Sequence, residues 1–199
     1  MKFQETSSLY SLNKSTYVNL RWIAYIGQLI AILVVEFFFK FKFDYFLCIS
    51  IILFSVLTNI YLKFFIKDNQ INNSISSIYL GYDILQLGIL LYITGGITNP
   101  FVVLLIVPAV FSSQYLKLIS SILLVIFTVL ILFFLTFFYN ELPHPGELHF
   151  HAPDYYLYAV PIATAIGLIF LVYFGVKFGI ENRIRKQAYD QIQEIMAKE

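Results

Sequence analysis

The chain has 199 residues, of which 59% are hydrophobic and 13% charged, and its mean hydropathy is +0.78. Soluble domains carry about 25% charged residues, so this composition excludes an ordinary soluble protein and predicts one that is embedded in a lipid bilayer. The formal net charge of +1 gives no reason to expect nucleic acid as a partner.

Apolar segments of roughly 16 to 22 residues approximate the ~20 residues that a helix needs to cross the bilayer. Six such segments occur, at 22–39, 45–66, 78–94, 101–116, 118–139 and 158–178. We therefore predict an all-α polytopic membrane protein with a cytoplasmic N-terminal segment at 1–21, a six-helix transmembrane domain at 22–178, and a cytoplasmic linker helix at 179–199 that begins a stalk. The first apolar segment has no small-residue cleavage site, so it reads as a retained anchor.

The distribution of basic residues predicts the orientation of these segments. Of the 13 Lys and Arg residues, all except Lys40 and Lys42 fall on the side of the two termini. Because cytoplasmic loops of membrane proteins are enriched in basic residues, we expect both termini in the cytoplasm and, if the organism is a Gram-negative bacterium, the protein in its inner membrane. The loops at 95–101 and 140–157 then face the periplasm.

Within the first two segments, three features have structural explanations. Arg21 and Trp22 stand at the cytoplasmic end of the first span, where snorkelling and the interfacial aromatic belt account for them. Glu36 and Lys40 have the spacing of an ion pair on one helix face. Cys48 is the single cysteine and lies in an apolar run, so we expect a buried side chain that forms no disulfide within the chain.

The third segment carries a polar stripe into the bilayer. Asp83 and Gln86 share a helix face, and Tyr79 lies close to it. A carboxyl group at membrane depth is costly and marks a candidate functional site, here with a possible role in proton coupling. The alternative is that Asp83 and Gln86 bond across helices to residues such as Gln28 or Thr58.

The loop at 95–101 joins the third and fourth segments without a single charge. Gly95 and Gly96 permit unusual backbone angles and close approach, Pro100 biases Asn99 away from helix, and Phe101 places a ring beside the Asn99 amide. Asn can donate to a carbonyl or accept from a hydroxyl, so the loop is suited to a flat ligand with polar edges. The same residues are also typical of a tight turn between antiparallel helices.

The loop at 140–157 contains the only group of residues in the sequence that resembles a metal site. His144, His149 and His151 lie among carboxylates, and this combination suits zinc or copper. The spacing matches no helix-borne ligand motif, and several prolines indicate irregular backbone, so a solvated or pH-responsive loop is the interpretation we adopt.

After residue 178 the chain becomes polar and carries a short heptad pattern. Ile184, Ala188, Gln191 and Ile195 fit one seam with charges around it. Such a seam favours a parallel dimer stalk, although two heptads are also compatible with a cap that anchors the last span.

The heptapeptide Gly95 to Phe101, GGITNPF, resembles the GGxxNPF signature of the RegB/PrrB/ActS family of redox-responsive sensor histidine kinases. The resemblance extends to Leu20-Arg21-Trp22, to Gly27-Gln28, and to the positions that lead into the two glycines: Asp83, Gln86, Leu87, Leu91 and Thr94.

This resemblance implies that ubiquinone or ubiquinol binds at the loop, with Gly95, Gly96, Asn99, Pro100 and Phe101 as the contact residues. It also implies a homodimer that signals through a kinase region to a response regulator. The 199 residues contain neither a phosphoacceptor-histidine motif nor the glycine-rich ATP-binding boxes, so we assign them no catalytic residues.

Two other classes of function stay open at this point. A small transporter or channel would use Asp83, Gln86 and Glu36 along a polar path, and it would predict an inverted repeat that the sequence does not display. A membrane metalloenzyme would be built on the histidine loop, and it would require bound zinc, copper or iron.

Overall fold

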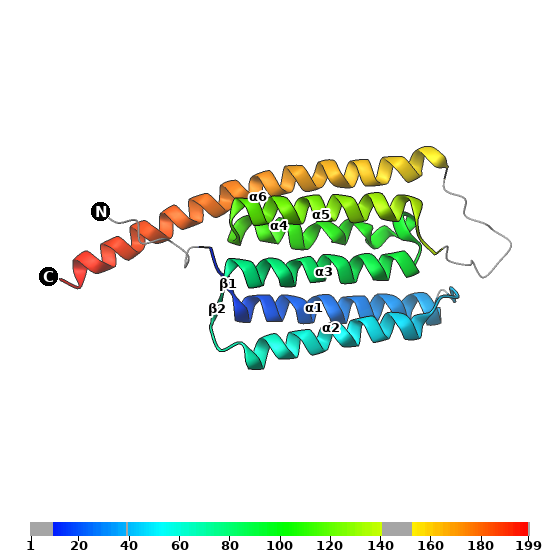
Figure 1. Cartoon of the computed structure of the whole chain (residues 1–199), viewed down its shortest axis with the longest axis horizontal. Helices are drawn as coiled ribbons and strands as arrows, with labels where there is room; N and C mark the ends of the chain where they lie inside the picture. The colour runs from blue at the N-terminus through cyan, green and yellow to red at the C-terminus, as the bar shows by residue number, and fades with distance from the viewer. Residues whose placement is uncertain (1–9, 39, 141–152, 199) are drawn as a thin grey trace.

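The computed structural model describes residues 10–38, 40–140 and 153–198, and the helices among them run side by side in one bundle (Figure 1). The α-helices are α1 (Lys14–Leu33), α2 (Tyr45–Phe65), α3 (Asn73–Ile93), α4 (Ile106–Tyr115), α5 (Leu118–Phe137) and α6 (Asp154–Met196). A π-helical turn, η2 (Val34–Phe38), continues α1, and two 3₁₀ segments, η3 (Gly96–Thr98) and η4 (Pro100–Leu105), precede α4. The predicted all-α class is confirmed.

Polar caps set where the helices begin. The side chains of Asn13, Asp44 and Asn72 accept hydrogen bonds from Thr16 N, Leu47 N and Ile75 N at 3.1, 3.0 and 2.9 Å. These bonds satisfy backbone donors that the first turn leaves free. As a result α1 and α3 begin several residues before the predicted apolar segments at 22 and 78, because hydropathy locates the hydrocarbon-spanning part of a helix and not its capped end.

Two short strands tie α1 to the start of α3. β1 (Leu12–Asn13) pairs antiparallel with β2 (Gln70–Ile71), with Leu12 opposite Ile71. The Lys14 side chain donates to the Ile66 carbonyl oxygen at 2.6 Å at the same end of the bundle. Leu12 and Ile71 are both buried, so this small sheet closes one end of the apolar core.

Five helices of the described chain have the length and apolar composition to cross a membrane: Lys14–Phe38, Tyr45–Phe65, Asn73–Ile93, Leu118–Phe137 and Tyr155–Met196. The remaining predicted segment, 101–116, forms the shorter apolar stretch Pro100–Tyr115. Six of its residues are 3₁₀-helical and ten are α-helical. Because a 3₁₀ helix rises ~2.0 Å per residue and an α-helix ~1.5 Å, this stretch extends about 27 Å, close to the ~30 Å hydrocarbon thickness.

Helix α3 lies in the middle of the bundle, with α1 and α2 on one side and α4, α5 and α6 on the other (Figure 1). The core therefore forms around α3. Leu80, Ile84 and Leu91 contribute to the larger buried cluster, and Leu90 and Ile93 to a smaller one that also contains Cys48. Cys48 is fully buried, as predicted.

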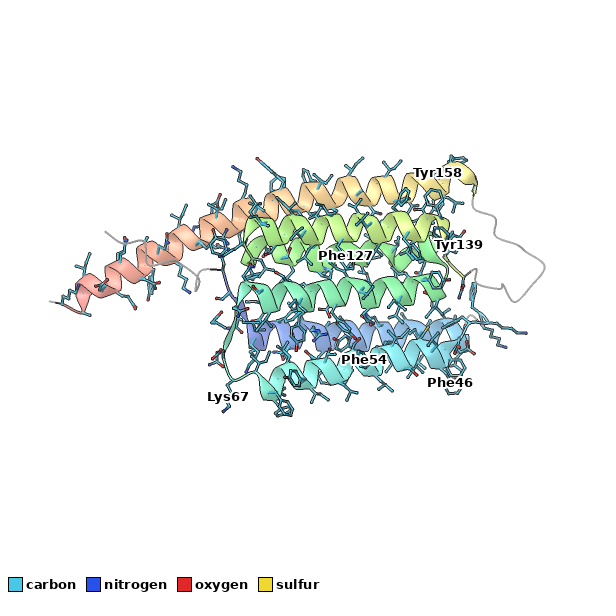
Figure 2. The ribbon with its side chains drawn as sticks, in the orientation of Figure 1. Phe46, Phe54, Lys67, Phe127, Tyr139 and Tyr158 are labelled. Atoms are coloured by element: carbon cyan, nitrogen blue, oxygen red, sulfur yellow. The ribbon has the colours of Figure 1, made fainter. Side chains whose placement is uncertain are left out.

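Many outward-facing side chains are large and apolar, and several of them are aromatic. Figure 2 shows Phe46, Tyr139 and Tyr158 at the end where α3 meets η3, and Lys67 at the opposite end. Phe54 lies between these ends and is 60% exposed, as expected of a side chain that faces lipid.

The last helix is continuous through the predicted boundary at residue 178. α6 runs for 43 residues and extends beyond the other helices at the end that carries β1 and β2 (Figure 1). In this extension Ile184 and Ile195, two positions of the heptad seam, are 60% and 63% exposed. The linker helix is thus a direct prolongation of the last span.

Candidate functional site

The loop at 95–101 is a compact turn at one end of the bundle. Gly95 and Gly96 have φ angles of 103° and 57°, in the left-handed region that favours glycine. The Thr98 hydroxyl donates to the Gly95 carbonyl oxygen at 2.6 Å, and Ile97 is 1% exposed. The buried Ile97 side chain anchors the turn in the apolar core.

Gly96 provides the close approach that the sequence predicted, and in this structure the group that approaches is Tyr139. A Cβ atom at Gly96 would lie 2.3 Å from Tyr139 Cβ and 2.4 Å from its Cγ. Just beyond, Asn140 N donates to the Tyr92 carbonyl oxygen at 2.8 Å. The segment that follows α5 therefore packs directly onto the loop.

The Asn99 side chain is held by the loop itself. Its Nδ2 donates to the Thr94 carbonyl oxygen at 2.8 Å and to Thr94 Oγ1 at 2.9 Å, and its Oδ1 accepts from Phe101 N at 2.9 Å. The two amide hydrogens thus have two acceptors, and the amide oxygen keeps one lone pair. Asn99 closes the turn and caps η4, which supports the turn interpretation of this motif.

The aromatic ring beside this amide remains accessible. Phe101 is 44% exposed, and Pro100 begins η4, where its missing N–H costs nothing. Gly95, Gly96, Asn99, Pro100 and Phe101 are thus brought together in one turn. Two cavities lie between α2 and α3 in the described part of the chain, and none of these five residues lines either of them.

Asp83 on α3 forms a buried ion pair with Arg21 on α1. Arg21 Nη2 lies 2.9 Å from Asp83 Oδ1, and Nε donates to the same oxygen at 3.0 Å. Nη2 also donates to Thr58 Oγ1 on α2 at 2.9 Å, while the Tyr17 hydroxyl donates to Asp83 Oδ2. One polar cluster therefore joins α1, α2 and α3.

The interpretation of Arg21 as an interfacial, snorkelling residue is wrong, because its side chain is only 3% exposed. A carboxylate inside a span requires a partner, and Arg21 is the basic residue that lies at a similar depth on a neighbouring helix. That requirement is the signal by which sequence reasoning could have found the pair. Trp22 is half-buried and packs against the larger core cluster.

Four tyrosine rings surround the Arg21 guanidinium, a feature that sequence reasoning missed. Its central carbon lies 5.6, 5.5, 5.3 and 5.8 Å from the ring centroids of Tyr17, Tyr25, Tyr79 and Tyr82. Cation–π attraction of this kind strengthens when water is absent. Tyr17 and Tyr25 flank Arg21 at helical i−4 and i+4 spacing, which is a readable pattern once the charge is known to be buried.

The alternative of interhelical polar bonding is what the structure shows for Gln86. Gln86 Nε2 donates to Gln28 Oε1 at 3.0 Å, and the reverse bond measures 3.5 Å. Thr58 bonds Arg21 and not Asp83. These pairings use the polar groups that a transporter path would need, and the involvement of Asp83 and Gln86 in proton coupling stays a prediction.

The predicted Glu36–Lys40 ion pair does not form. The helix changes to π geometry at Val34–Phe38, and Lys40 follows with a φ of 57°. Within the described residues the ion pairs are Arg21–Asp83 and Lys198–Glu194. The i+4 argument failed because it assumed an unbroken α-helix.

The three histidines of the predicted metal-like group, His144, His149 and His151, lie outside the described residues. In the described ranges, no group of three or more His, Cys, Asp or Glu side chains is arranged to hold a metal ion.

Helix α4, which follows the loop, is seated on α6 by two glycines. A Cβ at Gly175 would lie 1.9 Å from Ser113 Oγ, and one at Gly179 would lie 2.6 Å from the Gln114 carbonyl oxygen. Arg183 Nη1 donates to that same carbonyl oxygen at 3.1 Å. The loop is therefore connected through α4 to the part of α6 where the exposed extension begins.

Comparison with known proteins finds a curated relative that matches most of the chain. The chain is 28% identical over 185 residues to the sensor histidine kinase RegB of Cereibacter sphaeroides, and the match covers 92% of this chain and 40% of that protein. This similarity supports a RegB-like family relationship, and together with the apolar helices it supports a membrane sensor domain. No family model matches the chain, and no solved structure matches it significantly.

Proposed function

We propose that this chain, as a relative of RegB, is the membrane redox-sensing domain of a two-component sensor histidine kinase, with ubiquinone and ubiquinol as its ligands. The observation that carries the proposal is the match to RegB over 92% of the chain. It is supported by the GGITNPF turn, which directly precedes η4 and α4, and α4 packs on α6. The kinase region and its response regulator belong to the whole protein, of which this chain represents about two fifths by comparison with RegB.

The proposed topology has six crossings in a bacterial inner membrane. Pro100–Tyr115 adds the fourth crossing in chain order to the five longer helices, because its 3₁₀ turns lengthen it to about 27 Å. An even number of crossings puts both termini on the same side, and the basic residues favour the cytoplasm. The loop at 95–101 then lies near the periplasmic surface, where a quinone head group that diffuses within the membrane can reach it.

The proposed quinone site is the exposed side of this turn. Phe101 supplies an accessible ring for stacking, and Asn99 Oδ1, which accepts from Phe101 N, keeps one lone pair. An accepting oxygen suits the hydroxyl of a quinol. The carbonyl of an oxidised quinone needs a donor instead, and it obtains one only by displacing Thr94 from the Asn99 amide.

This difference gives the two redox forms unequal effects on the protein. Reduced ligand leaves the Asn99–Thr94 bonds intact, whereas oxidised ligand opens the turn at the point where η4 and α4 begin. A ligand shifts a conformational equilibrium only through such differential affinity. The movement passes through α4 to Gly175 and Gly179 of α6, and along the C-terminal extension of a homodimer to the kinase.

Phe101→Ala is expected to weaken binding of a short-tailed ubiquinone by about threefold to tenfold, because stacking contributes ~0.5–1.5 kcal/mol beyond area burial. The matched control is Leu104→Ala, since Leu104 lies on the same 3₁₀ helix and is 42% exposed against 44% for Phe101. Equilibrium titration of the purified protein in detergent measures both affinities. Equal affinities for Phe101→Ala and Leu104→Ala would show that the ubiquinone does not bind at this loop.

Thr94→Val is expected to favour the oxidised ligand. The substitution removes the Oγ1 acceptor at 2.9 Å and releases one Asn99 amide hydrogen, while the bond to the Thr94 carbonyl oxygen remains. A net hydrogen bond contributes about 1 kcal/mol, so affinity for ubiquinone should rise about fivefold, while that for ubiquinol should change less than about twofold. Parallel titrations with both redox forms decide this, and an equal change for both contradicts the proposed discrimination.

A further inference from the structure

We propose that the groove between α2 and α3 is a second ligand site, which binds a membrane-soluble molecule with a planar ring and a carbonyl oxygen. The groove lies away from the 95–101 turn, because Gln86 is about 14 Å from Gly95 along α3 at ~1.5 Å per residue. The choice of quinones as probes rests on the proposed function, whereas the site itself rests on the geometry of the groove.

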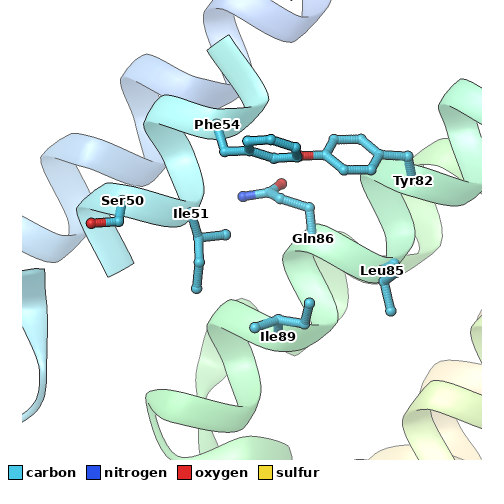
Figure 3. Close-up of a pocket in the computed structure, with 7 residues that line it drawn as sticks. All are labelled: Ser50, Ile51, Phe54, Tyr82, Leu85, Gln86 and Ile89. Atoms are coloured by element: carbon cyan, nitrogen blue, oxygen red, sulfur yellow. The ribbon is translucent and has the colours of Figure 1, made fainter. Parts of the chain in front are cut away.

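The groove contains a cavity of about 310 Å³ (Figure 3). Its lining residues are Ser50, Ile51, Phe54, Tyr82, Leu85, Gln86 and Ile89. A second cavity of about 400 Å³ adjoins it on the other side of Tyr82. Sites for small organic ligands have volumes of about 300–1,000 Å³ with mostly apolar linings and few polar groups, and both cavities fall in this class.

One buried polar side chain faces this cavity with unused hydrogen-bonding capacity. Gln86 is 3% exposed, and among the described residues its amide bonds only Gln28. One hydrogen of Nε2 therefore remains for an acceptor. In Figure 3 the Gln86 amide lies beneath the rings of Phe54 and Tyr82, with its nitrogen directed toward α2.

The aromatic side of the cavity is held in place. The rings of Phe54 and Tyr82 have centroids 6.3 Å apart, and the Tyr82 hydroxyl lies 2.7 Å from Ser55 Oγ. Because Ser55 Oγ donates to the Ile51 carbonyl oxygen at 3.0 Å, Tyr82 is the donor in the bond between the hydroxyls. The hydroxyl bond thus fixes the Tyr82 ring, and the Phe54 ring lies against it at an interplanar angle of 56°, so a flat ring that enters the cavity meets an aromatic face.

The lining selects among possible occupants. It contains no charged side chain, so the ligand is neutral. A lipid acyl chain would leave the free Gln86 hydrogen without an acceptor, which is costly in hydrocarbon. A helix of a second copy approaches closely only where small residues line the contact, whereas Phe54, Leu85 and Ile89 border this cavity. A planar carbonyl compound satisfies both the rings and the amide.

The test uses photoreactive azido derivatives of a short-tailed benzoquinone and a short-tailed naphthoquinone, applied to the purified chain in lipid nanodiscs. The labelled residues are mapped by peptide mass spectrometry. We expect labels on α2 between Ser50 and Phe54 and on α3 between Tyr82 and Ile89, in addition to any label on the 95–101 turn. The two probes distinguish which ring system the groove prefers.

Two variants and one control sharpen the test. Ile89→Trp fills the cavity and should abolish labelling of the groove. The matched control is Ile126→Trp on α5, since Ile126 is 51% exposed against 40% for Ile89. It should leave the labelling unchanged, because Ile126 lines neither of the two cavities. Gln86→Leu removes the donor and should weaken binding about threefold to tenfold.

Labels confined to the turn, or groove labelling that persists in Ile89→Trp, would overturn the inference. The inference would also be overturned if added phosphatidylcholine, which has no ring, suppressed groove labelling as effectively as an unlabelled quinone does. That outcome identifies an acyl chain as the occupant. Labels on the groove without any label on the 95–101 turn would instead contradict the quinone site of the proposed function and leave the second site standing. The two failures are therefore distinguishable.

Discussion

Asp83→Leu is expected to destabilise the protein by about 3–5 kcal/mol, because it leaves the Arg21 guanidinium buried without its carboxylate. The pair is 3% and 16% exposed and connects α1 to α3, with a further bond to Thr58 on α2. Loss of the partner leaves a charge in a low-dielectric environment that the four tyrosine rings only partly compensate. Thermal or denaturant unfolding in detergent, followed by circular dichroism, measures the change.

Two further variants separate the unpaired charge from the general effect of substitution. Arg21→Met combined with Asp83→Leu should recover most of the stability, because apolar replacement of a whole buried pair is often nearly neutral. Glu194→Gln breaks the exposed pair with Lys198, whose side chains are 69% and 72% exposed, and should leave unfolding unchanged. If Asp83→Leu proves as harmless as Glu194→Gln, the cluster does not hold the three helices together.

Gly179→Ala is expected to destabilise the protein by about 1–3 kcal/mol and to weaken the coupling between α4 and α6. The added Cβ would lie 2.6 Å from the Gln114 carbonyl oxygen and 3.1 Å from its carbonyl carbon. These are backbone atoms, so relief requires the two helices to separate. The same movement would disturb the Arg183 bond to that carbonyl oxygen. Unfolding in detergent measures the stability change.

Gly167→Ala on the same helix is the matched control, because no described atom lies within 4 Å of its added Cβ. Alanine is favoured over glycine in a helix by about 0.8–1.0 kcal/mol, so this variant should be slightly more stable than the parent. The two substitutions thus have opposite expected signs. If the proposed function holds, the effect of quinone on autophosphorylation of a kinase that carries this domain should be reduced by Gly179→Ala and retained in Gly167→Ala. Equal behaviour of the pair would show that α4 and α6 are not coupled at this contact.

The features that the sequence predicted well are those that depend on composition and on local chemistry. An apolar stretch in a bilayer must satisfy its own backbone hydrogen bonds, which makes helix the outcome wherever such a stretch occurs. Burial of Cys48 followed from the apolar run around it. The turn at 95–101 was also readable, because two glycines with positive φ and an Asn-Pro step define it locally.

The predictions that failed depended on details of backbone geometry or on distant partners. The Glu36–Lys40 pair required a regular helix, which the π turn at Val34–Phe38 interrupts. Arg21 was assigned to the interface because its partner, Asp83, lies 62 residues away.

By itself the sequence determined that this protein is a bundle of membrane helices with an uncharged turn between the third and fourth apolar segments, because hydrophobicity and backbone constraint act on each segment separately. Only the tertiary structure decided that Arg21 and Asp83 neutralise each other and that Gly179 seats α4 on α6. Each of these depends on which side chains the packing of the helices brings within a few ångströms of one another, and packing that pairs buried polar groups is energetically favoured.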